Sequence, residues 1–323
     1  MSLIKIEPNG GCSVQTERAR EGHIMKEITL EELLEAGCHF GHQVTRQNPR
    51  ARDFIFEARD NIHIIDLVKT KEGLDAAAKY IYELAKKGGN LIVVGTKRQA
   101  RNIVEEEVNK ARLQITQNAN PDEGNIFYVT NRWIGGLLTN FGEVSKNYKK
   151  LQDLTKKLQD SEEKAKYTKK EVGLWGREKE NLESFYGGVH QMKKLPDALF
   201  IIDTHLEELA VREATRMGVV TVGVVDTNSD PFLIDYPIPA NDDAVGSIKL
   251  IVSYIIDAWV EGRKAQSLEA QKSENKEEKA AKAEKSENKE EKTLKVKKSA
   301  KPETKKKEEK DAKSKSRTVK KTA

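Results

Sequence analysis

The stretch Val93-Val94-Gly95-Thr96-Lys97-Arg98-Gln99-Ala100-Arg101, written VVGTKRQAR, is the segment of this protein that is most informative about its fold class. It completes an apolar run, 91–94, that ends in a glycine and turns into a helical pattern over 99–111. A strand, a glycine turn and a helix N-terminus are the arrangement with which α/β proteins hold phosphate groups. The stretch therefore predicts an α/β domain, and it leaves two sources for a phosphate: a nucleotide or the backbone of a nucleic acid.

Short apolar runs alternate with helical patterns through the rest of the middle of the chain. Strands are expected at 126–129, 198–202 and 219–225, and helices at 74–85, 206–217 and 243–261. Two apolar segments flanking Arg59-Asp60-Asn61 predict a hairpin, and Thr29-Leu-Glu-Glu32 is a capping box that opens a short helix closed by Gly37. Strands that are apolar throughout predict a parallel sheet with helices on both faces.

One block, residues 142–186, does not follow this alternation. It is polar and helical, and its apolar residues recur at spacings of three and four. They are Val144, Tyr148, Leu151, Leu154 and Leu158, followed by a second run around Val172, Trp175, Leu182 and Phe185. The pattern predicts an antiparallel coiled-coil arm inserted into the α/β domain of residues 25–262. Two ordinary amphipathic helices lying on the sheet are the alternative.

The two ends of the chain differ from the middle. The net charge of +5 combines 22 Lys+Arg and 12 Asp+Glu in residues 263–323, a net of +10, with a net of −5 in residues 1–262. Residues 263–323 repeat the octamer KSENKEEK and contain no aromatic residue, which predicts a disordered Lys/Glu-rich tail. Residues 1–24 are expected to form a disordered leader, with Met25 as a candidate translation start.

Composition and motifs exclude several classes of protein. Two cysteines make no disulfide framework, which is typical of a reducing cytoplasm, and no apolar run approaches the length of a membrane span. Neither glycine-rich nucleotide motif, Gly-x-x-x-x-Gly-Lys-Ser/Thr or Gly-x-Gly-x-x-Gly, occurs. No Ser/His/Asp or Cys/His set has a catalytic spacing. We therefore expect neither an enzyme, nor a nucleotide cofactor, nor a membrane protein.

Clustered cations instead favour a larger polyanion. Lys97, Arg98 and Arg101 occupy the turn where a nucleotide site would have glycines, although a solvated helix start is the alternative. Arg46, Arg50 and Arg52 lie in a turn-rich loop, and Arg132 precedes Trp133 and the glycine pair 135–136. Trp133 itself is expected in the core or at a hinge rather than as a stacking platform.

Metal ligands are weakly indicated. Cys38, His39 and His42 are close in sequence, but no fourth ligand lies nearby, so packing and local hydrogen bonding are the simpler interpretation. Asp203, His205 and Asp226 follow predicted strands, where they could hold a cation; capping of the next helix or loop is the expected role.

An ordered series of motifs resembles one family. The motifs are HFGH (39–42), NP (48–49), IHIIDL (62–67), GTK (95–97), NRWIGG (131–136), LTN (138–140), LPD (195–197), VDTNSDP (225–231) and IPANDD (238–243). Together they resemble ribosomal protein two of the bacterial small subunit over residues 25–263. The resemblance implies a flavodoxin-like α/β domain with a protruding coiled-coil arm. It also implies a structural constituent of the small ribosomal subunit that binds small-subunit rRNA, supports translation and is ribosome-bound in the cytoplasm.

The implied partners are that rRNA and neighbouring small-subunit proteins, including the large multidomain mRNA-binding ribosomal protein, with the arm contacting either. Three features depart from the family pattern: Gln47 stands where tryptophan is common, Lys193-Lys194 replace small residues and add candidate phosphate contacts, and the tail extends beyond the family core. An enzyme on the same fold and a free coiled-coil adaptor are the rival hypotheses.

Overall fold

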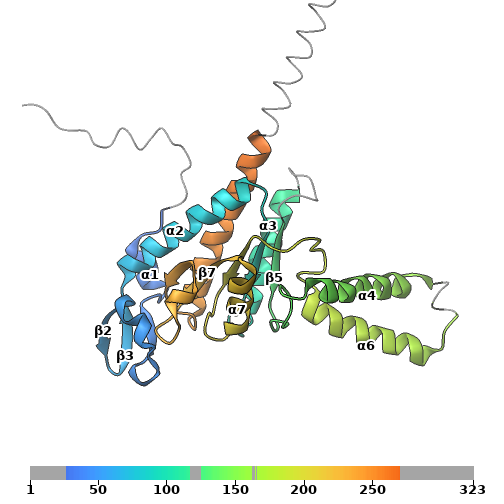
Figure 1. Cartoon of the computed structure of the whole chain (residues 1–323), viewed down its shortest axis with the longest axis horizontal. Helices are drawn as coiled ribbons and strands as arrows, with labels where there is room; N and C mark the ends of the chain where they lie inside the picture. The colour runs from blue at the N-terminus through green and yellow to red at the C-terminus, as the bar shows by residue number, and fades with distance from the viewer. Residues whose placement is uncertain (1–26, 117–124, 162–163, 165, 270–323) are drawn as a thin grey trace, which may run out of the picture. The chain divides into compact units, whose positions relative to one another are not determined.

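The computed structural model describes residues 27–116, 125–161, 164 and 166–269 (Figure 1). The compact unit ends at Gln266. The predicted leader 1–24, the candidate start Met25 and the repeated octamers lie outside the described residues.

A five-stranded parallel sheet forms the centre of the unit. Its spatial order is β5-β4-β6-β7-β8, and every neighbouring pair is parallel. The strands are β4 (Leu91–Val94), β5 (Ile126–Val129), β6 (Ala198–Ile201), β7 (Val220–Val225) and β8 (Tyr236–Pro239). Counted along the chain, this is the order 2-1-3-4-5, which is the flavodoxin-like arrangement. The predicted parallel sheet is confirmed.

The edge strand β8 is absent from the prediction because its sequence, Tyr236-Pro-Ile-Pro239, is typical of a proline-rich loop. Proline lacks the N–H that a central strand needs, but an edge strand has one unpaired side where that lack costs nothing. Ile238 between the two prolines is fully buried, and Val224 is its register partner in β7. Tertiary pairing thus overrides the local signal.

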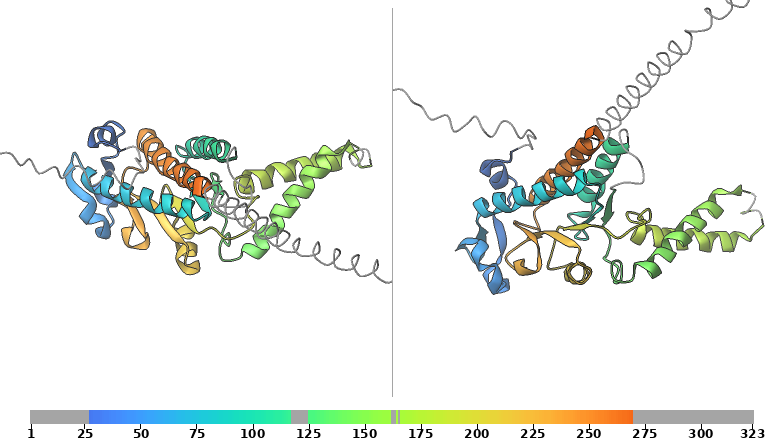
Figure 2. Two further views of the ribbon diagram at one scale, coloured as in Figure 1. Left: turned by 90° about the horizontal axis from the view of Figure 1, so that it is seen from above. Right: turned by 45° about the horizontal axis from the view of Figure 1, so that its top comes forward.

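Helices cover both faces of the sheet (Figure 2). On one face lie α2 (Leu67–Lys86), α3 (Arg101–Thr116) and the helix of residues 245–269; on the other lies α7 (Glu208–Met217). Alternate residues of β4 enter different apolar clusters: Leu91 and Val93 join the first, and Ile92 and Val94 the second. This is why the strand is apolar at every position.

A three-stranded antiparallel sheet, in the order β1-β3-β2, precedes α2. Its strands are β1 (Phe40–Gln43), β2 (Ile55–Arg59) and β3 (Ile62–Ile65). Asp60 and Asn61 have φ of 50° and 62°, as a two-residue hairpin turn requires, so the predicted hairpin is confirmed. The capping box also forms: Thr29 and Glu32 bond reciprocally at the start of α1 (Leu30–Glu35).

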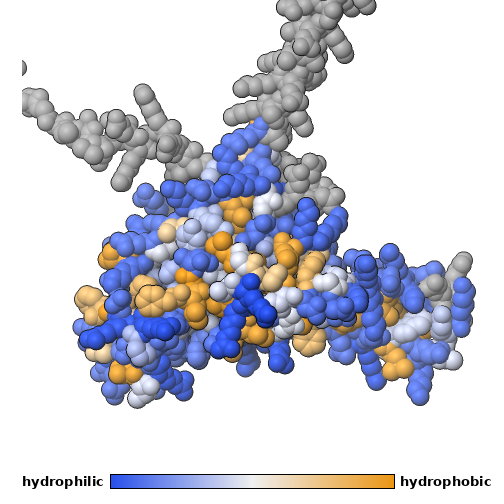
Figure 3. Space-filling view, viewed as in Figure 1, coloured by the Kyte–Doolittle hydropathy of each residue, from blue (hydrophilic) through white to orange (hydrophobic). Residues whose placement is uncertain are grey.

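The inserted block forms two helices, α4 (Phe141–Gln159) and α6 (Lys169–Tyr186), which pack side by side and extend away from the sheet (Figure 1). Lys150 of α4 pairs with Glu178 of α6. On the face seen in Figure 3, hydrophilic residues cover most of this arm. None of the helices in the described ranges combines the length and apolar character needed to cross a bilayer.

The base of the arm belongs to the domain core. Tyr148 and Tyr186 meet edge to face, with ring centroids 5.5 Å apart, and both lie in the apolar cluster that holds Phe127 and Trp133 of the sheet and its loop. Leu151, one turn further out, is buried outside that cluster. The sequence pattern predicts that the apolar residues of the arm pack only between its two helices. In the structure, the apolar residues nearest the domain also pack against the sheet.

The closing helix continues past the predicted boundary at 262. It runs from residue 245 to residue 269, the last residue described. Arg263, expected in the tail, is only 4% exposed and donates a hydrogen bond to Gln266. The helix therefore belongs to the folded unit as far as Gln266.

Candidate functional site

Gly95 is required for packing at the end of β4. A Cβ atom placed there would lie 2.7 Å from Cγ2 of Val104 in α3 and 2.9 Å from Cδ1 of Ile202. Both separations are too short for carbon atoms, so only glycine lets the helix approach the strand this closely. The glycine of VVGTKRQAR therefore serves helix–strand packing.

Lys97 points into the sheet edge rather than outward. Its Nζ lies 3.2 Å from Oδ2 of Asp203, 2.9 Å from Oδ1 of Asp242 and 2.7 Å from Oδ1 of Asp243. These aspartates follow β6 and β8, so the parallel strands bring them to the residue that follows β4. The side chain of Lys97, a predicted RNA contact, is therefore directed towards three carboxylates and not outward to solvent.

The cluster shifts the pKa values of its members. Burial raises the pKa of Asp242 to about 7, assisted by the charges of Asp203 and Asp226 and opposed by Lys97. Burial acts to lower the pKa of Lys97, but the carboxylates, led by Asp242, outweigh it and raise that pKa above its ordinary value. The cluster thus holds more acidic groups than one lysine neutralises.

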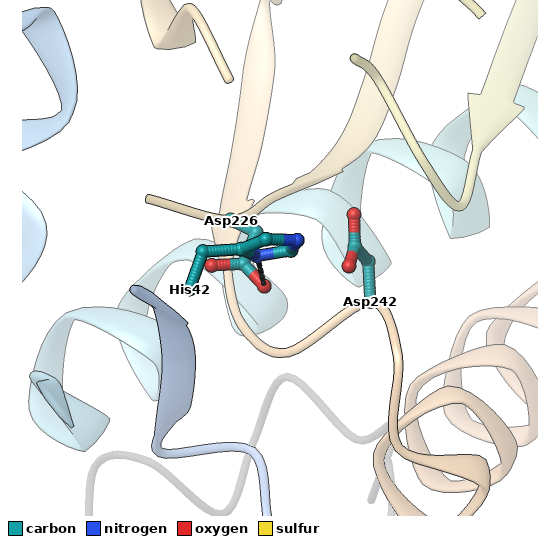
Figure 4. Close-up of side chains that lie close together, drawn as sticks. All are labelled: His42, Asp226 and Asp242. Atoms are coloured by element: carbon teal, nitrogen blue, oxygen red, sulfur yellow. Dashed lines mark ion pairs between the residues drawn. The ribbon is translucent and has the colours of Figure 1, made fainter. Parts of the chain in front are cut away.

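His42 of β1 completes the cluster (Figure 4). Its Nδ1 lies 3.0 Å from Oδ2 of Asp226, and its Nε2 lies 3.6 Å from Oδ2 of Asp243. The hydrogen bond with Asp226 is the main reason that the pKa of His42 is raised. Ligand-type atoms of His42, Asp226 and Asp242 all lie within 4.8 Å of one another. One imidazole nitrogen and two carboxylate oxygens are donors that a cation such as Zn²⁺ accepts.

The sequence indicates two groups of candidate metal ligands, and only one residue of each group lies in the cluster of His42, Asp226 and Asp242. Asp203 pairs with Lys97 and accepts a hydrogen bond from the backbone N–H of Leu206 at 2.8 Å, which is the expected capping role. His205 is exposed. Cys38 is buried, and burial raises the pKa of its thiol. Of the two predicted sets, Asp226 and His42 are the members that lie together.

Two arginines lie at the start of α3. Arg98 and Arg101 are exposed, and Arg132 is exposed in the loop after β5. Arg101 donates from Nε to the carbonyl of Thr96 at 2.8 Å and from Nη2 to the carbonyl of Asn131 at 3.3 Å. These two bonds tie the loop after β4 to the loop after β5, so three predicted cations share one edge of the sheet.

The loop carrying Arg46, Arg50 and Arg52 reaches the same edge. It forms two 3₁₀ helices, η2 (Val44–Arg46) and η3 (Pro49–Phe54). The backbone N–H of Asn48 donates to the carbonyl of Thr227, just after β7, at 2.8 Å, and Arg50 pairs with Asp230 at 2.5 Å. All three arginines are exposed.

Lys193 and Lys194 are placed differently. Both are exposed and lie in the loop that leads to the amino end of β6, which begins at Ala198. The arginines described above follow the carboxyl ends of strands or pack against such loops. The nine predicted cations therefore do not form one continuous set.

Glu213 is a residue that the sequence patterns did not single out. Its carboxylate accepts backbone hydrogen bonds from Gly136 at 2.7 Å, Leu138 at 3.1 Å and Thr139 at 3.4 Å, and one from Nε1 of Trp133 at 3.4 Å. Gly136 has φ of +89°, which glycine alone adopts without strain. A glutamate on the otherwise apolar face of α7 was the available signal, because a buried charge needs several donors.

Comparisons with known proteins agree on one family. The family model of ribosomal protein S2 matches residues 33–262. The small ribosomal subunit protein uS2 of Coprothermobacter proteolyticus is 45% identical over 242 residues, covering 75% of this chain and 85% of the relative. The protein of the same name in Acidobacterium capsulatum is 43% identical, and the match covers 74% of this chain and 74% of the relative. The one in Geotalea uraniireducens is 42% identical, and the match covers 76% of this chain and 91% of the relative. The chain therefore belongs to the ribosomal protein S2 family.

Proposed function

We propose that this protein is a structural constituent of the small ribosomal subunit, in which it binds small-subunit rRNA and supports translation. The relatives at 42–45% identity are named as proteins of that subunit. Family membership carries the proposal, and the exposed arginines at the carboxyl edge of the sheet support it. Phosphate contacts position a protein on RNA, and arginine meets phosphate with two parallel N–H donors.

The proposed phosphate contacts are Arg46, Arg50, Arg52, Arg98, Arg101 and Arg132, with Lys193 and Lys194 as a separate set. Lys97 is left out because its ammonium group already faces three carboxylates. Transferring that lysine to phosphate would leave the buried Asp242 without its cation, which costs roughly 3 kcal/mol or more. In this proposal the protein therefore contacts RNA through arginines of the VVGTKRQAR stretch and of neighbouring loops, and not through Lys97.

The arm of α4 and α6 supplies a second contact in this proposal. Because the arm projects from the domain, it can contact partners that lie at a distance from the sheet. Its outer face meets rRNA or neighbouring proteins, including the large multidomain mRNA-binding ribosomal protein. Packing of α4 against α6 and the polar surface seen in Figure 3 support this role. The ribosome-bound protein would then act in the cytoplasm.

An enzyme on the same fold is the competing function, and one observation opposes it. In flavodoxin-like sheets, ligands bind at the carboxyl ends of the strands where the strand order reverses, here between β4 and β6. Part of that crevice is closed by Lys97 and its aspartates. A thermal-shift screen with ATP, NAD and FMN tests this point: a saturable rise of several degrees would establish a small-molecule site and count against the structural role.

The decisive test is association with ribosomes. The tagged chain should migrate with small subunits in a sucrose gradient of cell lysate. Replacing Arg98, Arg101 and Arg132 by glutamine should weaken binding to purified small-subunit rRNA. The slope of log affinity against log salt should fall by about 0.7 to 0.9 for each phosphate that the variant no longer binds.

A matched control removes equal charge elsewhere. Lys79, Lys87 and Arg216 are exposed on other helices or their ends, and their replacement by glutamine should leave the salt slope unchanged. Equal effects of the two triple variants would mean that only net charge matters. Absence of the chain from small-subunit fractions would refute the proposed function.

A further inference from the structure

An open pocket of about 910 Å³ lies beside the Lys97 cluster. Its walls come from the loop after β4 (Thr96), the first residue of α3 (Arg101), the loop after β5 (residues 131–135), the segment after β6 that leads into α7, and the base of α6. It therefore occupies the other part of the crevice at which strand order reverses, which is where ligands bind on this type of sheet. A pocket of this volume is large enough to hold a single nucleotide.

The pocket has a cationic rim. Arg101 is held there by its bonds from Nε and Nη2 to the carbonyls of Thr96 and Asn131, and its third nitrogen, Nη1, takes part in neither bond. Arg132 lines the same pocket and is exposed. Two guanidinium groups at the mouth of a pocket suit an anionic chain, because each meets a phosphate through planar N–H donors.

Apolar side chains also line the pocket and remain accessible. Phe185, Leu206 and Leu209 are 43%, 57% and 50% exposed, although each lines the pocket. A protein rarely leaves such side chains together in a concave site without a ligand. The ring of Phe185 offers the flat apolar surface on which an unpaired base stacks.

A buried acid completes the site. Glu207 lines the pocket, is only 6% exposed and accepts a hydrogen bond from the hydroxyl of Thr96. Its carboxylate is a buried acceptor with Asp203 and Arg132 as charged neighbours, and a base edge carries N–H donors that match such an acceptor. The cationic rim, the aromatic wall and the buried acceptor thus match the phosphate, the ring face and the ring edge of a nucleotide.

We propose that this pocket receives one unpaired nucleotide of the RNA, with its base on Phe185 and its flanking phosphates on Arg101 and Arg132. The inference rests on the proposed RNA-binding function and specifies its form: the domain binds a single-stranded segment there and not only a duplex backbone. A duplex cannot present a base to the pocket unless that base leaves the stack.

The test compares a single-stranded RNA oligonucleotide with an abasic ribose-phosphate chain of the same length. Phe185→Ala should weaken binding of the RNA about fivefold or more and leave binding of the abasic chain unchanged, because stacking on an aromatic contributes that much per base. Arg101→Gln should weaken both ligands equally and lower the salt slope by about 0.7. Phe185→Trp should keep the affinity for RNA.

Phe56→Ala is the control, because Phe56 is 71% exposed on the antiparallel sheet and does not line the pocket. An RNA affinity that ignores Phe185→Ala, or falls equally for the abasic chain, overturns the pocket inference while the proposed function stands. A wild-type chain that binds neither ligand overturns both.

A second measurement separates RNA from a protein occupant. With p-benzoylphenylalanine in place of Phe185, irradiation of assembled small subunits should cross-link this chain to an unpaired nucleotide of the rRNA, and the same substitution at Phe56 should not. A cross-link from position 185 to a neighbouring protein, or no cross-link, would overturn the inference.

Discussion

Glu213 of α7 accepts a hydrogen bond from the indole Nε1 of Trp133 at 3.4 Å. This bond attaches the loop that follows β5 to α7. The same carboxylate accepts three backbone N–H groups of that loop. The loop also carries Arg132 and lines the proposed nucleotide pocket. One buried acid thus sets the geometry of a candidate RNA-binding loop.

Replacing this acid should destabilise the protein. In Glu213→Gln, an amide NH₂ group faces backbone N–H donors and leaves at least one of them unsatisfied, which costs about 1–3 kcal/mol. For a domain of this size, we expect the melting temperature to fall by about 2–4 °C for each kcal/mol. Glu208→Gln, an exposed position on the same helix, should change it little. Equal melting curves for the two variants would contradict this role of Glu213.

Lys97→Met should lower stability without changing the salt dependence of RNA binding. It leaves Asp203, Asp242 and Asp243 without their shared cation, and removing one partner of a buried ion pair costs about 3 kcal/mol or more. The double variant with Asp242→Asn should recover part of that stability, because it removes the most deeply buried of the three acidic groups. Urea unfolding and a salt titration with rRNA give the two readouts. A lower salt slope in Lys97→Met would show that this lysine contacts phosphate after all.

The stability of the domain should fall as the pH rises towards neutrality. The pKa of Asp242 is raised to about 7 by burial, so the folded carboxyl keeps its proton at pH values where the unfolded one has released it. A raised pKa contributes stability that is fully present below the unfolded value, about 3.9, and lost as the pH rises through about 7. The raised pKa of His42 acts in the same direction above about pH 6.5.

Asp242→Asn isolates this contribution. Between about pH 4 and 7, the free energy of unfolding of the wild type should decline relative to the variant by up to about 1.4 kcal/mol per pH unit. Denaturant titrations at several pH values provide the measurement. Parallel pH profiles for the two proteins would show that Asp242 ionises as readily in the folded chain as in the unfolded one.

Shortening the arm should have two different outcomes, depending on where it is cut. Replacing residues 149–181 by a short Gly/Ser linker keeps Tyr148 and Tyr186 in the core, so the melting temperature should fall by only a few degrees. Replacing 141–185 also removes Val144 and Tyr148 from the apolar cluster and should cost several kcal/mol. Melting curves test the packing, and a protein inventory of purified subunits tests assembly. Normal incorporation and normal partner content for the shorter deletion would remove the arm from the proposed function.

Truncation at the other end tests the revised boundary. A chain ending at residue 269 should melt within a degree or two of the full protein, because the composition beyond it cannot build a core. A chain ending at 262 lacks the buried Arg263 and the last turns of the closing helix, and it should melt distinctly lower. Equal melting temperatures for the two truncations would place the end of the fold at 262.

The fold class can be predicted from the sequence alone, because the patterns that indicate strands, helices and turns are local. Apolar strands such as Leu91–Val94, the Thr29 capping box and the Asp60-Asn61 turn each report the conformation of a few consecutive residues. Family membership is legible in the same way, since ordered motifs such as NRWIGG need no coordinates. The cations could be named only as candidates, because a charge in a sequence carries no direction.

Which groups meet depends on contacts between distant parts of the chain. Lys97 turns inward because strands far apart in the sequence deliver Asp203 and Asp242 to its side, and no local pattern encodes that field. The edge strand β8 forms against its prolines because β7 supplies partners on one side alone. Glu213 and Phe185 are surrounded by loops that are distant from them in the sequence. Long-range packing sets the electrostatics of this edge, and spacing along the chain cannot show it.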